Sequence, residues 1–75
     1  PVNLTLTEYQ ILKYMAENMG HVITRENLVS ALSGTISIEI GSINVHMLNL
    51  RRKIGEQYFM TVRGLGYKLV IPEES

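Results

Sequence analysis

The sequence predicts an α+β domain in which three helices are followed by a C-terminal β-hairpin. Three segments carry apolar residues at spacings of three and four, and glycines or capping residues stand at their ends. Residues 58–63 and 67–71 then read as two strands on either side of Gly64-Leu65-Gly66. The 75 residues allow a single domain.

The N-terminal segment predicts a short strand and then a helix. Val2, Leu4 and Leu6 alternate with polar residues, which is a strand pattern. Thr7 is expected to cap the first helix, and Gly20 is expected to end it. The expected core face of this helix consists of residues at helical spacing: Tyr9, Leu12, Met15, Ala16 and Met19.

The middle of the chain predicts a bridge, a second helix and a loop. Residues 21–23 are too short for more than an isolated bridging strand. Thr24 is expected to cap the second helix, whose apolar face is Leu28, Ala31 and Leu32. Segment 33–41 holds two glycines and two serines and is predicted to be a loop, although its three isoleucines alternate with polar residues.

A third helix and a hairpin complete the predicted fold. Ser42 is expected to cap this helix and Gly55 to end it, and its core stripe is Ile43, Met47, Leu50 and Ile54. Gly64 and Gly66 supply the positive φ angles that a tight hairpin turn requires. Three helices followed by a two-stranded hairpin is the plan of a winged helix-turn-helix, with the hairpin as the wing.

Composition excludes several classes of function. The chain has no cysteine, so it forms no disulfide, thiolate metal site or thiol nucleophile. It has no aspartate, and its two histidines lie on different predicted elements without an evident nucleophile nearby. No apolar run approaches the roughly 18 residues that span a membrane. We therefore expect a cytoplasmic domain that is not an enzyme and needs no cofactor or metal.

The formal net charge is zero, but the basic residues are clustered. Residues 1–40 hold two basic and four acidic residues, a net charge of −2, whereas residues 41–68 hold five basic residues and one acidic residue, a net charge of +4. Local charge density governs phosphate binding, so this cluster indicates a nucleic-acid partner. Basic residues at the end of a helix also complement the helix dipole, which leaves both interpretations open for the basic run 51–53.

The outer face of the third helix is predicted to enter a DNA major groove. Opposite its core stripe it carries Val45, Leu48, Asn49 and Arg52. Val45 or Leu48 can contact a thymine methyl group, and Asn49 can bond an adenine edge. An apolar outer face also suits a protein partner, so a winged-helix protein-interaction module is the alternative.

Phosphate contacts are predicted on both sides of this face. Arg51 and Lys53 flank it, and His46 can donate to a phosphate, although a surface histidine without a task is the plainer interpretation. In the hairpin, Arg63 stands beside Gly64 at the tip, which suits a minor groove because negative potential there attracts arginine. Thr61 is expected to bond a phosphate; a solvated arginine in a glycine-rich turn is the plain alternative.

Four motifs in this order resemble the DNA-binding domain of OmpR/PhoB-family response regulators. They are Leu-Thr-x-Thr-Glu-Tyr at 4–9, Thr-Arg-Glu-Asn-Leu at 24–28, Asn-Val-His at 44–46 with Leu-Arg-Arg-Lys at 50–53, and Thr-Val-Arg-Gly-Leu-Gly-Tyr at 61–67. Each motif alone is weak, but their joint order is specific. The resemblance implies a winged-helix output domain for transcriptional regulation in a two-component phosphorelay system.

The resemblance also implies a longer protein and particular partners. Residues 1–75 would form the DNA-binding domain, preceded by a phospho-acceptor receiver and by most of a small N-terminal sheet. The third helix would enter the major groove and the hairpin the minor groove of double-stranded promoter DNA. Dimers of the full-length protein would bind direct repeats, and loop 33–41 would contact RNA polymerase.

The resemblance assigns roles residue by residue, with some departures from the family pattern. Val45 matches an apolar base contact, Arg63 matches the minor-groove arginine, and phosphate contacts fall on His46, Arg51 and Thr61. Residues that are commonly basic, or in one case tryptophan, are replaced by others: Gly41, Leu48, Asn49, Met60 and Ser33. The departures predict weaker or less salt-dependent DNA binding, or binding that depends on dimerisation.

Overall fold

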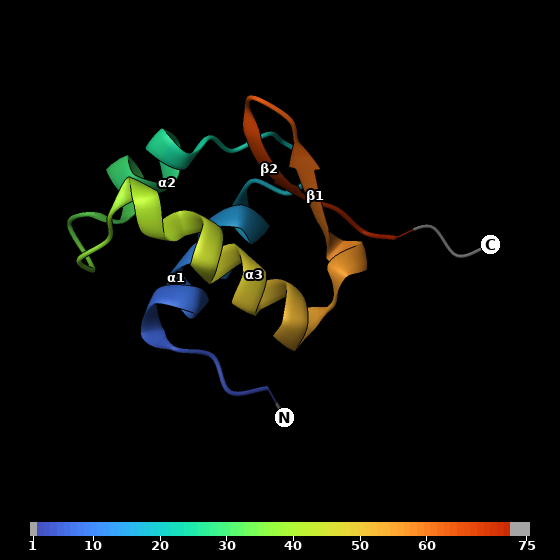
Figure 1. Cartoon of the computed structure of the whole chain (residues 1–75), viewed down its shortest axis with the longest axis horizontal. Coiled ribbons are helices and arrows are strands. Elements are labelled where there is room, and N and C mark those ends of the chain that lie inside the picture. The colour runs from blue at the N-terminus through green and yellow to red at the C-terminus, as the bar shows by residue number, and fades with distance from the viewer. Residues whose placement is uncertain (1, 73–75) are drawn as a thin grey trace.

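The computed structural model describes residues 2–72 and confirms three helices followed by a hairpin (Figure 1). Helix α1 packs against α2 and α3, and the hairpin stands beside the helices. In chain order the elements are α1 Leu6–Glu17, α2 Arg25–Leu32, the 3-10 turn η1 Ile40–Ser42, α3 Ile43–Ile54, the 3-10 turn η2 Glu56–Tyr58, β1 Phe59–Val62 and β2 Gly66–Leu69. The acidic tail 73–75 lies outside the described residues.

The core draws on all three helices and both strands. The predicted stripe of α3 is confirmed at three of its four positions, while Ile54 is half-buried. In α2, Leu28 and Leu32 are buried but Ala31 is exposed. The buried apolar residues are Ile11, Met15, Ile23, Leu28, Leu32, Ile43, Met47, Leu50, Phe59, Tyr67 and Leu69.

The start of the first helix was predicted wrongly. Residues 2–5 form no strand, and Thr5 rather than Thr7 is the N-cap. The Glu8 amide donates to Thr5 Oγ1 at 3.1 Å, and the Thr5 amide donates to Glu8 Oε1 at 3.0 Å. This reciprocal pair satisfies two backbone donors that the first turn otherwise leaves unpaired, so the helix begins at Leu6.

The predicted core face of α1 is confirmed at Met15 and at the half-buried Leu12, but not at Ala16, which is exposed. Ile11 and Met15 are buried, whereas Tyr9 and Met19 are exposed. Glu8 shares the inward face, where its carboxylate meets Lys53 of α3. The helix ends at Glu17, and the predicted terminator at position 20 lies in the following turn with φ of +82°.

The cap of α2 was predicted correctly. The Asn27 amide donates to Thr24 Oγ1 at 2.9 Å, and the Thr24 amide donates to Asn27 Oδ1 at 3.2 Å. Ser42 occupies the N-cap position of α3 as predicted, but its side chain does not cap the helix, because its hydroxyl donates to the Glu39 carbonyl at 2.8 Å. Gly55, at φ of +136°, ends α3 as expected.

The loop between α2 and α3 is confirmed over residues 33–39, and η1 occupies its end. Ile36 and Ile38 pack against the core, whereas Ile40 is exposed. The alternating pattern therefore reflects anchoring of a loop by two side chains, not a strand.

The hairpin is shorter than predicted, and its turn is formed by residues 63–65 rather than 64–66, because Gly66 pairs with Val62 as part of β2 and does not have a positive φ angle. The strands pair antiparallel from Phe59 opposite Leu69 to Val62 opposite Gly66. The Leu65 amide donates to the Val62 carbonyl at 3.0 Å, with Gly64 at φ of +79° in the third position of that turn. A residue other than glycine is disfavoured at this φ angle.

The segment before α2 holds the hairpin against the helices. The Ile23 amide donates to the Tyr67 carbonyl at 2.7 Å, and the Tyr67 amide donates to the Ile23 carbonyl at 2.8 Å. This is the predicted isolated bridge. A Cβ atom on Gly66 would lie 2.1 Å from the Ile23 carbonyl oxygen, so only glycine permits this approach.

A buried ion pair joins α1 to the end of α3. Glu8 is 2% exposed, and its Oε1 lies 2.6 Å from Lys53 Nζ. Burial raises the pKa of the Glu8 carboxyl, but the Lys53 hydrogen bond and charge, together with the Thr5 hydrogen bonds, bring that pKa below its ordinary value. The pair therefore stabilises the folded state above the unfolded pKa, and this contribution is lost as pH falls through the folded pKa.

Replacing Gly66 with alanine is expected to destabilise the domain by about 1–3 kcal/mol, because the backbone of Ile23 must move away from β2. Urea unfolding at neutral pH measures the change. Gly34→Ala is the matched control, since a Cβ atom there meets no atom within 4 Å. Equal stability of the two variants would contradict the proposed close approach.

Replacing Lys53 with methionine is expected to lower the free energy of unfolding by about 2 kcal/mol at pH 7. This is less than for a deeply buried pair, because Lys53 is partly exposed. Burial then dominates at Glu8 and raises its pKa, so the deficit relative to the parent chain shrinks as the pH falls toward 4. Urea unfolding at pH 7 and pH 4 measures this, with Lys13→Met on the exposed side of α1 as control. A deficit that stays constant with pH would show that the ion pair contributes nothing.

Candidate nucleic-acid interface

The outer face of α3 is exposed as the sequence predicted. Val45 is 57% exposed and Leu48 is 44% exposed, and Arg52 is also exposed. Asn49 lies between them and is half-buried. The opposite side of the same helix is buried in the core. The helix therefore presents a mixed apolar and polar surface that the described fold leaves uncovered.

The basic end of α3 is joined to the hairpin by side chains. Arg51 donates through Nη2 to Thr61 Oγ1 on β1. The guanidinium carbon of Arg51 also lies 5.9 Å from the centroid of the Tyr67 ring on β2, within cation–π range. The Tyr67 hydroxyl donates to Asn44 Oδ1 at the start of α3. The structure thus brings together two of the predicted phosphate contacts.

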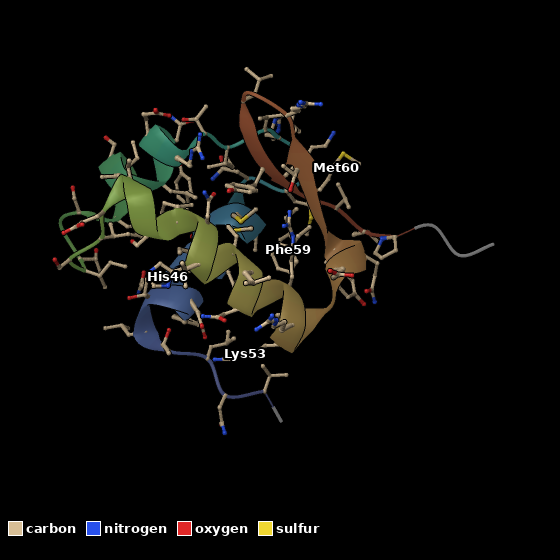
Figure 2. The ribbon with its side chains drawn as sticks, in the orientation of Figure 1. His46, Lys53, Phe59 and Met60 are labelled. Atoms are coloured by element: carbon tan, nitrogen blue, oxygen red, sulfur yellow. The ribbon has the colours of Figure 1, made fainter. Side chains whose placement is uncertain are left out.

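Two other predicted phosphate contacts, His46 and Lys53, also lie on α3 (Figure 2). His46 is half-buried on the helix. Lys53 binds the buried carboxylate of Glu8, which offsets its charge. Glu8 was not predicted as the partner of Lys53, from which it lies 45 positions away in the chain.

The tip of the hairpin exposes both residues predicted to act there. Arg63 and Gly64 are exposed in the turn, and Leu65 beside them is 61% exposed. Along β1, Phe59 points toward the helices and Met60 points away from them (Figure 2). The tip therefore combines a cation, a small residue and an apolar side chain.

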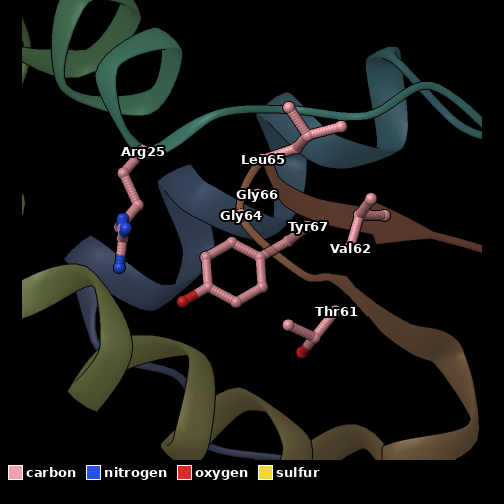
Figure 3. Close-up of a pocket in the computed structure, with 7 residues that line it drawn as sticks. All are labelled: Arg25, Thr61, Val62, Gly64, Leu65, Gly66 and Tyr67. Atoms are coloured by element: carbon pink, nitrogen blue, oxygen red, sulfur yellow. The ribbon is translucent and has the colours of Figure 1, made fainter.

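A hollow of about 70 Å³ separates the hairpin from the start of α2 (Figure 3). The Tyr67 ring lies between the side chains of Arg25 and Thr61. Arg25 was not among the predicted site residues. A signal was present, because a cation in the first turn of a helix is unfavourable to the helix dipole and calls for another reason. The lining residues are Arg25, Thr61, Val62, Gly64, Leu65, Gly66 and Tyr67.

Metal and membrane sites find no support within residues 2–72. That part of the chain holds no cluster of three side chains suited to a metal ion, and none of its helices is long and apolar enough to cross a bilayer. The candidate nucleic-acid interface is the surface of α3 and the hairpin.

Comparison with known proteins identifies the family. Residues 1–69 match the family described as "Transcriptional regulatory protein, C terminal". The chain belongs to this family. It is 42% identical over 72 residues to the response regulator protein PmrA of Pseudomonas aeruginosa, and 39% identical over 70 residues to the transcriptional regulatory protein QseB of Haemophilus influenzae. These matches cover 95% and 92% of the chain but only 33% and 32% of the two relatives, so the chain spans about a third of their length.

Solved structures of the family have the same fold. The C-terminal domain of the nisin resistance regulator NsrR is 38% identical, with a TM-score of 0.85 over 96% of this chain and 78% of that one. The DNA-binding domain of the response regulator AdeR, solved with an intercistronic region, is 34% identical with a TM-score of 0.79 over 93% and 74% of the two chains. The fold class and the resemblance to OmpR/PhoB-type response regulators are confirmed.

Proposed function

We propose that this winged-helix output domain reads promoter DNA by placing the outer face of α3 in the major groove and the hairpin tip in the minor groove. The chain belongs to a family of DNA-binding output domains of response regulators. The observation that carries the proposal is the exposure of the outer face of α3 together with that of an arginine at the hairpin tip. In a helix whose other face is buried, that surface is the part available to a partner.

Base reading is assigned to the middle of α3. Val45 and Leu48 would contact thymine methyl groups, and Asn49 would bond an adenine edge. Arg52, which points the same way, would bond a guanine or a nearby phosphate. Apolar side chains in place of arginines favour A·T-rich sites.

Phosphate contacts are assigned around this face. Arg51, Thr61 and His46 lie on α3 and β1 next to it, and Arg25 adds a cation across the hollow. Lys53 is left out of the proposed contacts, because reaching a phosphate would leave the buried Glu8 carboxylate unpaired. Arg63, with Gly64 allowing close approach, would enter the minor groove.

We further propose that the domain works within a longer, cytoplasmic response regulator. A receiver domain would control it by phosphorylation, and dimers would bind direct repeats. Loop 33–41 would contact RNA polymerase. The anchoring of this loop by Ile36 and Ile38 supports that role, because it holds polar residues such as Ser37 and Glu39 at the surface.

One observation favours the alternative of a protein-interaction module. The exposed side chains of Val45 and Leu48 would suit an apolar partner as well as a groove. The two functions differ in their response to salt, because only DNA releases condensed counterions when it is bound.

DNA binding is expected to weaken with salt. If about four phosphates are neutralised, log K should fall against log salt concentration with a slope of roughly −3.6. Fluorescence anisotropy with a labelled duplex between 50 and 200 mM salt, roughly the range over which such effects are large, gives the slope. A flat response would favour the protein-interaction module instead.

Substitutions on α3 and at the hairpin tip are expected to change DNA binding in different ways. Arg63→Ala should weaken binding to all duplexes and make the salt slope shallower by about 0.9. Asn49→Ala should instead relax the preference at one base pair, by about 1–3 kcal/mol. Binding to a panel of single-base variants of one duplex measures both effects, with Lys13→Ala as control. Equal losses on every duplex for Asn49→Ala would overturn its assignment to base reading.

A further inference from the structure

We propose that Arg51 on α3 and Thr61 on the hairpin bind one and the same DNA phosphate, and we call this pair of side chains the clamp. This inference rests on the proposed function and specifies it. It differs from a pair of separate phosphate contacts, because it makes the two residues a single binding unit.

The hydrogen bond between the two side chains is the first argument. The Thr61 hydroxyl accepts from Arg51 Nη2, so its own hydrogen is available to donate elsewhere. The guanidinium has five N–H donors, and this bond uses one of them. Free donors of both side chains therefore lie next to each other, and an anion with several acceptor oxygens can bind them together.

The second argument is that the Arg51 side chain is held before DNA arrives. Its guanidinium lies over the Tyr67 ring, and Tyr67 is only 6% exposed. The Tyr67 hydroxyl is bonded to Asn44, which fixes the ring against α3. Tyr67 is therefore a positioning residue, and less side-chain freedom remains to be lost on binding.

The consequence is a fixed spacing between α3 and the hairpin. A phosphate bound by both side chains ties α3 to β1 at the point where one strand of the duplex passes between them. Separate contacts would allow the hairpin and the helix to adjust independently. Removal of either side chain should therefore abolish most of the contribution that the other makes to the free energy of DNA binding.

A double-mutant cycle on DNA binding tests the coupling. The chain and its Arg51→Met and Thr61→Val variants are titrated with one duplex, enriched by the parent chain from a random-sequence pool. Each variant is expected to bind about 10-fold or more weakly, as for loss of a charged hydrogen bond. The double variant should lose little more than either single one, whereas independent contacts would multiply to about 100-fold.

Two controls separate coupling from general damage. Arg52→Met, next along the helix and pointing outward, should multiply with Thr61→Val because the two share no partner. Thr61→Ser keeps the hydroxyl and should restore binding, which a loss caused by altered packing would not do. Coupling of Arg52 as strong as that of Arg51, or failure of the serine to restore binding, would overturn the clamp.

A scan of the DNA backbone identifies the phosphate directly. Duplexes that each carry one neutral methylphosphonate are titrated with the parent chain and both variants. One position should weaken the parent chain yet have no effect on either variant. Different silent positions in the two variants would overturn the clamp while leaving DNA binding intact. Failure of the parent chain to bind the duplex even at low salt would overturn the proposed function and the clamp together.

Discussion

The approach of β2 to the backbone before α2 is the contact on which the rest of the site depends. The two backbone hydrogen bonds between Ile23 and Tyr67 attach the hairpin to the helices, and Gly66 leaves the space for that attachment. A two-stranded hairpin alone is at best marginally stable in water. Held by this bridge, it buries Tyr67 and Leu69 in the core and places its tip at a defined distance from α3.

The second determinant is the way α1 meets α3. A carboxylate in the first turn of α1 closes the helix cap and also binds the ammonium group near the end of α3. That pair offsets the charge of Lys53, whose side chain stays partly exposed. Arg51 is half-buried and bonded to Thr61, and Arg63 is exposed at the hairpin tip.

Local signals were sufficient for much of the fold. The Thr24 cap and the Gly55 terminus depend on partners within four residues, and the Gly64 turn depends on backbone conformation alone. The same rule failed at the N-terminus, because the alternation of Val2, Leu4 and Leu6 suggested a strand and concealed the cap at Thr5. The burial of Glu8 on α1 could not be predicted locally, since its partner Lys53 lies on α3.

The candidate site shows the same division. The exposed face of α3 follows from helical periodicity, so Val45 and Leu48 could be placed from sequence. The link from Arg51 to Thr61 required the position of the hairpin relative to α3. Arg25 entered the site for the same reason, because the hollow it lines exists only once the hairpin is placed.

Amide chemical-shift mapping by NMR during titration with a duplex tests directly whether DNA binds to α3 and the hairpin together. If α3 and the hairpin form one DNA-binding surface, the shifts should concentrate in residues 41–54 and 61–68, in the same concentration range for both segments. The exposed residues of α1, such as Tyr9, should remain unchanged. Shifts confined to α3, or centred on α1, would show that α3 and the hairpin do not form one DNA-binding surface.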